Sequence, residues 1–184
     1  MKITPVDSKN DLFFVENIYP QNLVDQVMSI DHRLTKSTCE EFQEDYPRKK
    51  LYHTHSVYNA MYTYVQSIQT TIEECVQMEF LSCDSAFWLD LPGFDMEKHL
   101  DNKKVFAAMQ IYLTENTRPM PTVFYNSDDS IRFEPEYCVN SGYLMFNNEN
   151  QWHAMPYTVP DNEYRLTSYT WFYQKRINTK PCLK

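Results

Sequence analysis

Three residues in the second half of the chain have the types and the spacing of a metal site. His99 and Asp101 are separated by one residue, and on a β-strand the alternation of side chains turns both toward the same face. His153 follows far enough downstream for the chain to cross a barrel several times and return beside them. Two imidazoles and one carboxylate form a facial triad, a ligand set that holds non-haem Fe(II) and leaves coordination positions open. We therefore predict that His99, Asp101 and His153 bind one ferrous ion.

An arginine further along could hold an anion beside that metal. Arg165 stands within the otherwise apolar and aromatic run YRLTSYTWFYQK. Its guanidinium can make two parallel hydrogen bonds to a carboxylate, a geometry that lysine cannot reproduce. Thr167 lies on the same face of that predicted strand and can add a third bond through its hydroxyl. We predict that Arg165 takes the far carboxylate of a keto acid whose other end chelates the metal.

Each of these residues also has a simpler interpretation. His99 and Asp101 could be a surface pair in a turn, which is the usual meaning of an isolated His-x-Asp. His153 could be a core histidine bonded to backbone, and Arg165 could be the partner in a surface salt bridge. The strand pattern around the pair favours the metal site, and a surface salt bridge does not explain an arginine in the middle of an apolar strand.

Short strands are the elements that must position these residues. Two amphipathic helices are predicted first, over residues 22–34 and 58–80, where apolar residues recur at helical spacing. Helices followed by a series of short strands predict an α+β domain with a jelly-roll barrel. From Cys83 onward the strand segments, separated by polar or proline-bearing turns, are SAFWLDL, EKHLD, KVFAAMQIYL, TVFYN, IRFEP, GYLMFN, QWHAM and YRLTSYTWFYQK.

The segment KVFAAMQIYL has two different faces. Polar groups among apolar ones suit a barrel interior, whereas a wholly apolar face suits packing against helices. The apolar face, predicted to meet the helices, carries Val105, Ala107, Met109, Ile111 and Leu113. The face predicted to line the interior carries Phe106, Ala108, Gln110 and Tyr112.

The order His-x-Asp, a distant histidine and then a basic residue resembles the Fe(II)- and 2-oxoglutarate-dependent dioxygenases, in particular their prolyl-hydroxylase-like branch. The resemblance covers the second half of the chain, with a weaker similarity at NIYPQNLVDQVM. It implies a double-stranded β-helix in which Tyr112, at the "YL" position, and Thr167 help Arg165 to hold the 5-carboxylate of 2-oxoglutarate. The family's Gly-Gly-Thr turn is replaced here by residues 118–122, RPMPT, and the serine two residues after the arginine is replaced by Thr167.

The resemblance also implies an activity. Fe(II), 2-oxoglutarate and O₂ would be required, with ascorbate as a candidate reductant, and succinate and CO₂ would be released as the prime substrate is hydroxylated. A peptidyl or protein side chain such as proline is the predicted prime substrate. A free amino acid or small metabolite is the alternative substrate, and a non-catalytic jelly-roll binding module is the alternative function.

The composition limits which binding partners and which cellular compartment are expected. The net charge of −8 gives no broad positive field for nucleic acid or anionic membranes, so neither is an expected partner. The five cysteines show no CxxC or regular spacing, which argues against a disulfide framework or a structural zinc and favours a reducing compartment. The sequence has neither a long apolar run nor a secretory leader pattern, and we expect a cytoplasmic protein.

One domain is expected over residues 1–184, because no repeat or linker divides the chain. We expect residues 1–82 to form helical support and a lid, and residues 83–175 to form the jelly-roll core. The polar segment 35–55 is the predicted lid over the site. His53 and His55 also form a His-x-His pair, but no Glu-and-His pair in cupin spacing follows them, and we expect them around the site or in the lid.

Overall fold

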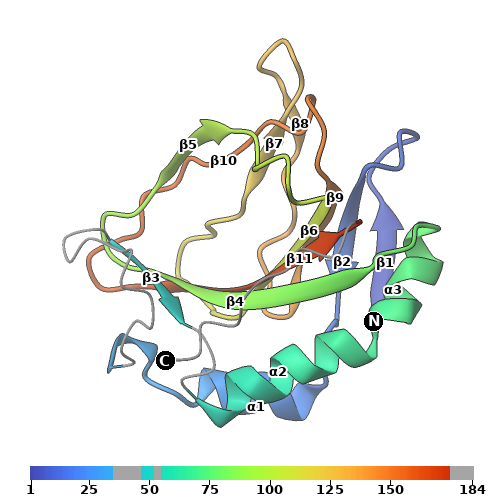
Figure 1. Cartoon of the computed structure of the whole chain (residues 1–184). Coiled ribbons are helices and arrows are strands. Elements are labelled where there is room, and N and C mark those ends of the chain that lie inside the picture. Colours follow the sequence, from blue (N-terminus) through green and yellow to red (C-terminus); the bar gives the residue numbers. More distant parts are fainter. Residues whose placement is uncertain (35–46, 52–54, 175–184) are drawn as a thin grey trace.

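The chain forms a β-rich α+β fold with two antiparallel sheets and few helices (Figure 1). The computed structural model describes residues 1–34, 47–51 and 55–174. The larger sheet has seven strands in the order β1-β2-β9-β6-β11-β4-β3, and the smaller has four in the order β5-β10-β7-β8. The strands of the larger sheet are β1 (Lys2–Pro5), β2 (Leu12–Glu16), β3 (Arg48–Leu51), β4 (Ser82–Asp90), β6 (Ala107–Tyr112), β9 (Ser141–Phe146) and β11 (Arg165–Tyr173). Those of the smaller sheet are β5 (Met96–His99), β7 (Val123–Tyr125), β8 (Ile131–Phe133) and β10 (His153–Met155).

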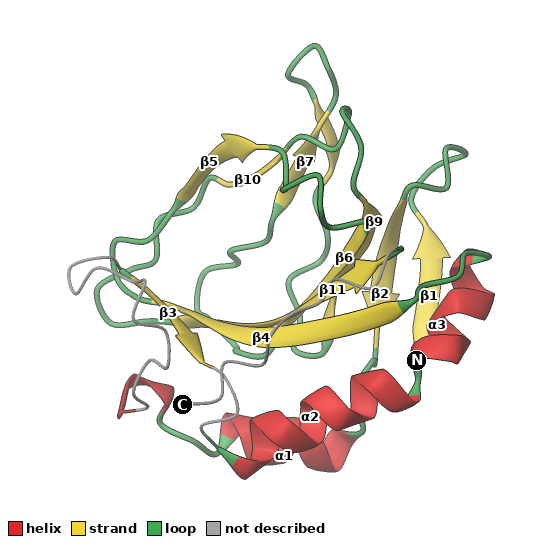
Figure 2. Cartoon of the chain, viewed as in Figure 1, coloured by secondary structure: helices red, strands yellow, loops and turns green. Residues whose placement is uncertain are grey.

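The helices cover one face of the larger sheet, and the smaller sheet lies over the other face (Figure 2). They are α1 (Gln21–Met28), α2 (Ser56–Ser67) and α3 (Gln69–Val76), with a short 3₁₀ turn over His32–Leu34. The predicted strands after Cys83 are all present. Apolar side chains pack between the two sheets and form an interior there.

Both predicted helices end earlier than the sequence pattern indicated. The helix predicted over 22–34 stops at Met28, where the Ser29 hydroxyl donates to the carbonyl of Gln26. The helix predicted over 58–80 is divided at Ile68, after Ser67 turns its hydroxyl back to the carbonyl of Tyr64. Serine hydroxyls that bond to nearby backbone compete with helical continuation, which the apolar periodicity does not register.

The N-terminal residues contribute more than helical support. Strands β1 and β2 extend the larger sheet beside β9, and β3 pairs with β4 at its other edge. Most of the predicted lid, residues 35–46 and 52–54 with His53, lies outside the described residues. Its described residues are 47–51, of which Arg48–Leu51 form the edge strand β3, and His55. His55 caps α2, accepting a hydrogen bond from the backbone N–H of Val57 at 3.3 Å.

The two faces of β6 divide the core as predicted from Ala107 to Leu113. Met109 and Ile111 pack with Met61 of α2 on the helix side, while Ala108 packs with Phe124 between the sheets. The prediction is wrong for the two residues before the strand. Phe106 packs on the helix side and Val105 between the sheets, because β6 begins only at Ala107 and the alternation does not extend before it.

Candidate metal centre and arginine subsite

The predicted metal ligands meet at one end of the smaller sheet. His99 ends β5, and His153, the first residue of β10, pairs directly opposite it. Asp101 lies just beyond β5, and the possible ligand atoms of the three residues are all within 4.8 Å of one another. Asp101 Oδ1 is 3.7 Å from His99 Nε2 and 3.6 Å from His153 Nε2. These separations are too long for hydrogen bonds, and they suit three atoms that share one cation.

Backbone carbonyls fix how both imidazoles face the cluster. The Nδ1 atom of His99 lies 2.8 Å from the carbonyl oxygen of Glu97, and Nδ1 of His153 lies 2.8 Å from that of Gln151. Because a carbonyl oxygen only accepts, each Nδ1 carries the proton and each Nε2 offers its lone pair. This is the arrangement of a metal-binding histidine.

Asp101 is oriented in the same way by Tyr169. The Tyr169 hydroxyl donates to Asp101 Oδ2 at 2.5 Å, which leaves Oδ1 toward the two histidines. Burial raises the pKa of Tyr169 well above its usual value, helped by the negative charge of Asp101, so the hydroxyl keeps its proton and remains a donor.

The protonation states also suit a cation. Burial raises the pKa of Asp101, but the His153 imidazole, the Tyr169 hydroxyl and His99 outweigh it, and the pKa lies below its usual range. Burial lowers the pKa of His99, and the neighbouring His153 lowers it further. At neutral pH the carboxylate is therefore ionised and His99 is neutral, as metal ligands must be.

Arg165 lies at the start of β11 and is completely buried. Its Nη1 donates to Asp90 Oδ2 at 2.7 Å, and its Nη2 donates to Thr122 Oγ1 at 3.2 Å and, more weakly, to Gln110 Oε1 at 3.4 Å. Its Nε is buried and has no hydrogen-bond partner among the described residues. The interpretation of Arg165 as a surface salt-bridge residue is therefore wrong.

Solved structures with a similar arrangement identify the fold. A prolyl-4-hydroxylase of Pseudomonas putida superposes with a TM-score of 0.65 at 14% sequence identity, covering 90% of this chain and 93% of that one. A Trichoplax adhaerens prolyl hydroxylase, solved with a hypoxia-inducible-factor peptide, gives 0.66 at 12% identity, covering 90% and 84%. The fold is that of a prolyl-hydroxylase-like 2-oxoglutarate oxygenase. A Burkholderia pseudomallei protein of the 2OG-Fe(II) oxygenase family also superposes, with a TM-score of 0.65 at 9% identity over 90% and 85% of the two chains.

The family resemblance seen in the sequence is thus confirmed at the level of the fold. The sequence matches no protein-family model and no curated protein. Within the described residues, no helix has the length and apolar character needed to span a bilayer.

Tyr112 and Thr167, the predicted helpers of Arg165, lie in the same buried network of this oxygenase fold. The Tyr112 hydroxyl accepts from the backbone N–H of Thr122 at 3.0 Å, and the Arg165 guanidinium carbon lies 5.4 Å from the centre of its ring. Thr167 Oγ1 accepts from Gln110 Nε2 at 3.1 Å. Thr167 is therefore linked to Arg165 through Gln110.

Asp90 and Thr122 belong to this subsite but were missed in the sequence. Asp90 is the last residue but one of the apolar segment SAFWLDL and the last residue of β4, and a carboxylate within such a segment was the available signal. Thr122 lies in the rebuilt turn RPMPT, which offers no regular pattern to read. The alternation of side chains along the strand placed Gln110 toward the interior, but the sequence assigned it no function.

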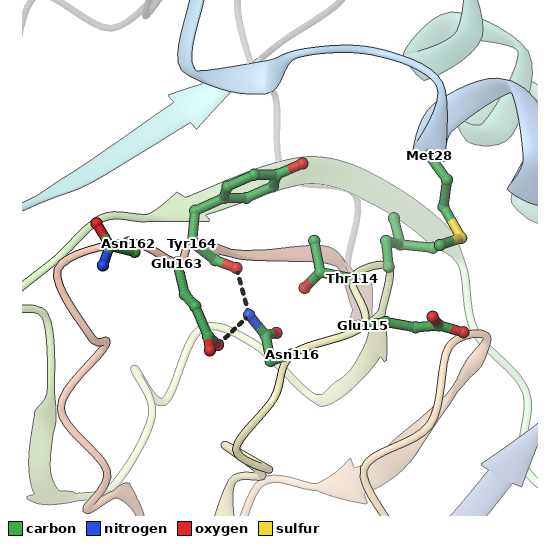
Figure 3. Close-up of a pocket in the computed structure, with 8 residues that line it drawn as sticks. Met28, Thr114, Glu115, Asn116, Asn162, Glu163 and Tyr164 are labelled. Carbon is green, nitrogen blue, oxygen red and sulfur yellow. Dashed lines mark hydrogen bonds between the residues drawn. The ribbon is translucent and has the colours of Figure 1, made fainter.

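A separate cavity of about 210 Å³ lies outside this site (Figure 3). Its lining shares no residue with the metal cluster or with the contacts of Arg165. The Asn116 amide inside it donates to the Glu163 carboxylate at 2.8 Å and to the Tyr164 carbonyl at 2.9 Å. We assign no ligand to it, because these polar groups already pair with one another. It is lined by Met28, Leu113, Thr114, Glu115, Asn116, Asn162, Glu163 and Tyr164.

Proposed function

We propose that the chain is an Fe(II)- and 2-oxoglutarate-dependent dioxygenase that hydroxylates a peptidyl or protein side chain such as proline and releases succinate and CO₂. The observation that carries the proposal is that one face of β11 contributes residues to both the metal cluster and the arginine subsite. Tyr169 reaches the metal cluster through Asp101, while Arg165, four residues earlier on the same face, offers a buried guanidinium. At about 3.3 Å per residue the two positions are roughly 13 Å apart along the strand. In this proposal, a keto acid chelates the cation through one end and presents its distal carboxylate to Arg165 at the other.

The donor set fits ferrous iron. Two imidazoles and one carboxylate can hold non-haem Fe(II) and leave positions open for a chelating keto acid and O₂. Bound together, these groups supply the oxidising power for hydroxylation through decarboxylation of the keto acid.

The protein's own part is binding, orientation and exclusion of water. The carbonyls of Glu97 and Gln151 aim the two imidazoles, and Tyr169 holds the carboxylate. Arg165, with Tyr112 and with Thr167 acting through Gln110, would hold the 5-carboxylate. Apolar packing between the sheets, where Phe124 lies 5.6 Å from the His153 ring, keeps water from one side of the cluster.

The finer features of the fold belong to the same proposal. The two facing sheets are consistent with a double-stranded β-helix, or jelly roll, within a single domain over residues 1–184. Cys75, Cys83 and Cys138 are free, which suits the reducing setting in which ferrous iron is easily kept. The peptide bound by the Trichoplax relative favours a peptidyl substrate over a free amino acid or small metabolite.

Succinate release tests the proposal directly. The protein supplied with Fe(II), 2-oxoglutarate and ascorbate should form succinate, and His153→Ala should abolish this while remaining folded. His55→Asn is the matched control, because His55 lies outside the cluster and asparagine is a good helix N-cap. Peptide and metabolite pools would then be searched by mass spectrometry for products that have gained one oxygen atom. Binding of 2-oxoglutarate without succinate release would indicate a binding module, and oxidation of free metabolites with peptides untouched would contradict the peptidyl substrate.

A further inference from the structure

Asp90 lies between two arginines in a row that crosses three strands. Arg48 of β3, Asp90 of β4 and Arg165 of β11 are direct cross-strand partners. Each carboxylate oxygen of Asp90 has its own cation: Oδ2 is 2.7 Å from Arg165 Nη1, and Oδ1 is 2.8 Å from Arg48 Nε. The first contact is a directed hydrogen bond, whereas in the second the N–H does not point at the oxygen and the attraction is ionic.

The row is removed from water. The side chains of Asp90 and Arg165 are fully buried, and that of Arg48 is only 12% exposed. Aromatic rings surround the cations: the Arg48 guanidinium carbon is 4.4 Å from the centre of the Trp88 ring and 4.6 Å from that of Phe94. In such surroundings each charge interacts strongly with its neighbours.

Within the described residues, two positive charges and one negative charge leave the row with an excess of one positive charge. A buried excess charge is costly unless something compensates it. Arg165 Nε is also buried without a partner among the described residues. Both observations indicate that the row is completed by an anion.

We propose that Arg48 and Asp90 set the charge of the co-substrate subsite, so that it selects keto acids carrying a second, distal carboxylate. Asp90 holds Arg165 in place but neutralises it, and Arg48 offsets Asp90 so that one positive charge remains for the ligand. Arg48 is thus a positioning residue that acts through Asp90. The inference rests on the proposed function, because it concerns the keto acid of that reaction.

The test compares two keto acids that differ in the distal charge. The full chain is loaded with Mn(II), which prevents turnover, and titrated calorimetrically with 2-oxoglutarate or with 2-oxopentanoate, which lacks the distal carboxylate. The measured quantity is the preference, the ratio of the two dissociation constants. The wild type should prefer 2-oxoglutarate by at least about tenfold, the ratio that corresponds to one modest ionic contact.

The variants change the charge of the row in known steps. Arg48→Gln makes it neutral, and the preference should fall by about tenfold. Arg48→Gln combined with Asp90→Asn restores one positive charge and should return the preference to near the wild-type value. Lys49→Gln is the matched control, because it removes a positive charge from the opposite face of the same strand and should change nothing.

The outcomes separate this inference from the proposed function. A wild type that binds neither keto acid in the presence of Mn(II) would overturn both. A wild type that prefers 2-oxoglutarate, with Arg48→Gln unchanged or the double variant as poor as the single, would overturn only the role of Arg48 and Asp90. If Arg48→Gln does not fold, Arg48→Lys carries the test: it keeps the charge, so the preference should persist, and its loss would overturn the inference.

Discussion

The metal cluster and the arginine subsite use the same face of β11 but are built in opposite ways. At the metal cluster, Asp101 stands 3.6–3.7 Å from the two histidine nitrogens, and each predicted ligand is bonded outward, to backbone or to Tyr169. At the arginine subsite the bonds point inward, and Arg165 is fully buried against Asp90. The possible ligand atoms of the metal cluster therefore face one another without a bond between them, whereas the arginine subsite is part of the folded core. Substitutions should accordingly cost metal binding at the first and stability at the second.

Arg165→Ala should have the largest effect on stability. It leaves Asp90 Oδ2 buried without its hydrogen bond, although Arg48 still balances the charge of the carboxylate, and a buried polar group left without its hydrogen bond costs about 1–3 kcal/mol. The free energy of unfolding, measured by denaturant titration of the metal-free protein, should fall by that amount. Asp101→Asn should cost less than about 1 kcal/mol, because the amide oxygen still accepts from Tyr169 and no buried charge loses its partner.

Arg33→Ala is the matched control for the arginine substitution. Arg33 pairs with Asp31 at the surface, with 58% of its side chain exposed, and such pairs contribute about 0–1 kcal/mol. If Arg165→Ala were as mild as Arg33→Ala, the arginine subsite would not be part of the folded core, and the contrast with the metal cluster would fail.

The rise in Tm on ligand binding should sharpen the comparison between the metal cluster and the arginine subsite. A ligand that binds only the native state at a hundredfold excess over Kd stabilises it by about 2.7 kcal/mol. For a domain of this size each 1 kcal/mol raises Tm by roughly 2–4 °C, so saturating Mn(II) should raise Tm by several degrees. The keto acid should add its own increment only when the metal is present, because it chelates the metal.

One result of the thermal melt would contradict this prediction. Equal stabilisation of the metal-free protein by 2-oxoglutarate would place the keto acid away from the metal cluster. His153→Ala should lose the response to Mn(II), whereas His55→Asn should keep it.

The features that depend on local pattern could be predicted from the sequence. Alternation along a strand placed Gln110 and Tyr112 toward the interior and Met109 and Ile111 toward the helices. The spacing of His99 and Asp101 is likewise local, and His153 was added to the predicted metal cluster because it lies far enough downstream for the chain to return beside them. The fold class followed from the series of short strands.

The features that depend on register between distant strands could not be predicted. Asp90 meets Arg48 and Arg165 only because β3, β4 and β11 pair in one particular alignment. The pairing of β2 with β9 is another long-range contact that the order of segments does not specify. The division of the long predicted helix at Ile68 is local, but it depends on backbone competition by Ser67 that apolar periodicity cannot detect.

Tyr169→Phe is the smallest predicted change and tests whether the outward bonds of the predicted metal ligands affect metal binding. It removes the hydroxyl that holds Asp101 Oδ2 but keeps the ring, so the carboxylate is free to rotate. Loss of such an orienting partner typically lowers metal affinity by about 10–100-fold. The Mn(II) dissociation constant should rise by that factor, with the fold intact by circular dichroism. Tyr157→Phe is the matched control, because Tyr157 donates to the exposed Glu134 and touches no ligand. If Tyr169→Phe bound Mn(II) like the wild type, Asp101 would be positioned by its backbone alone, and the metal cluster would depend less on outward bonds than the comparison requires.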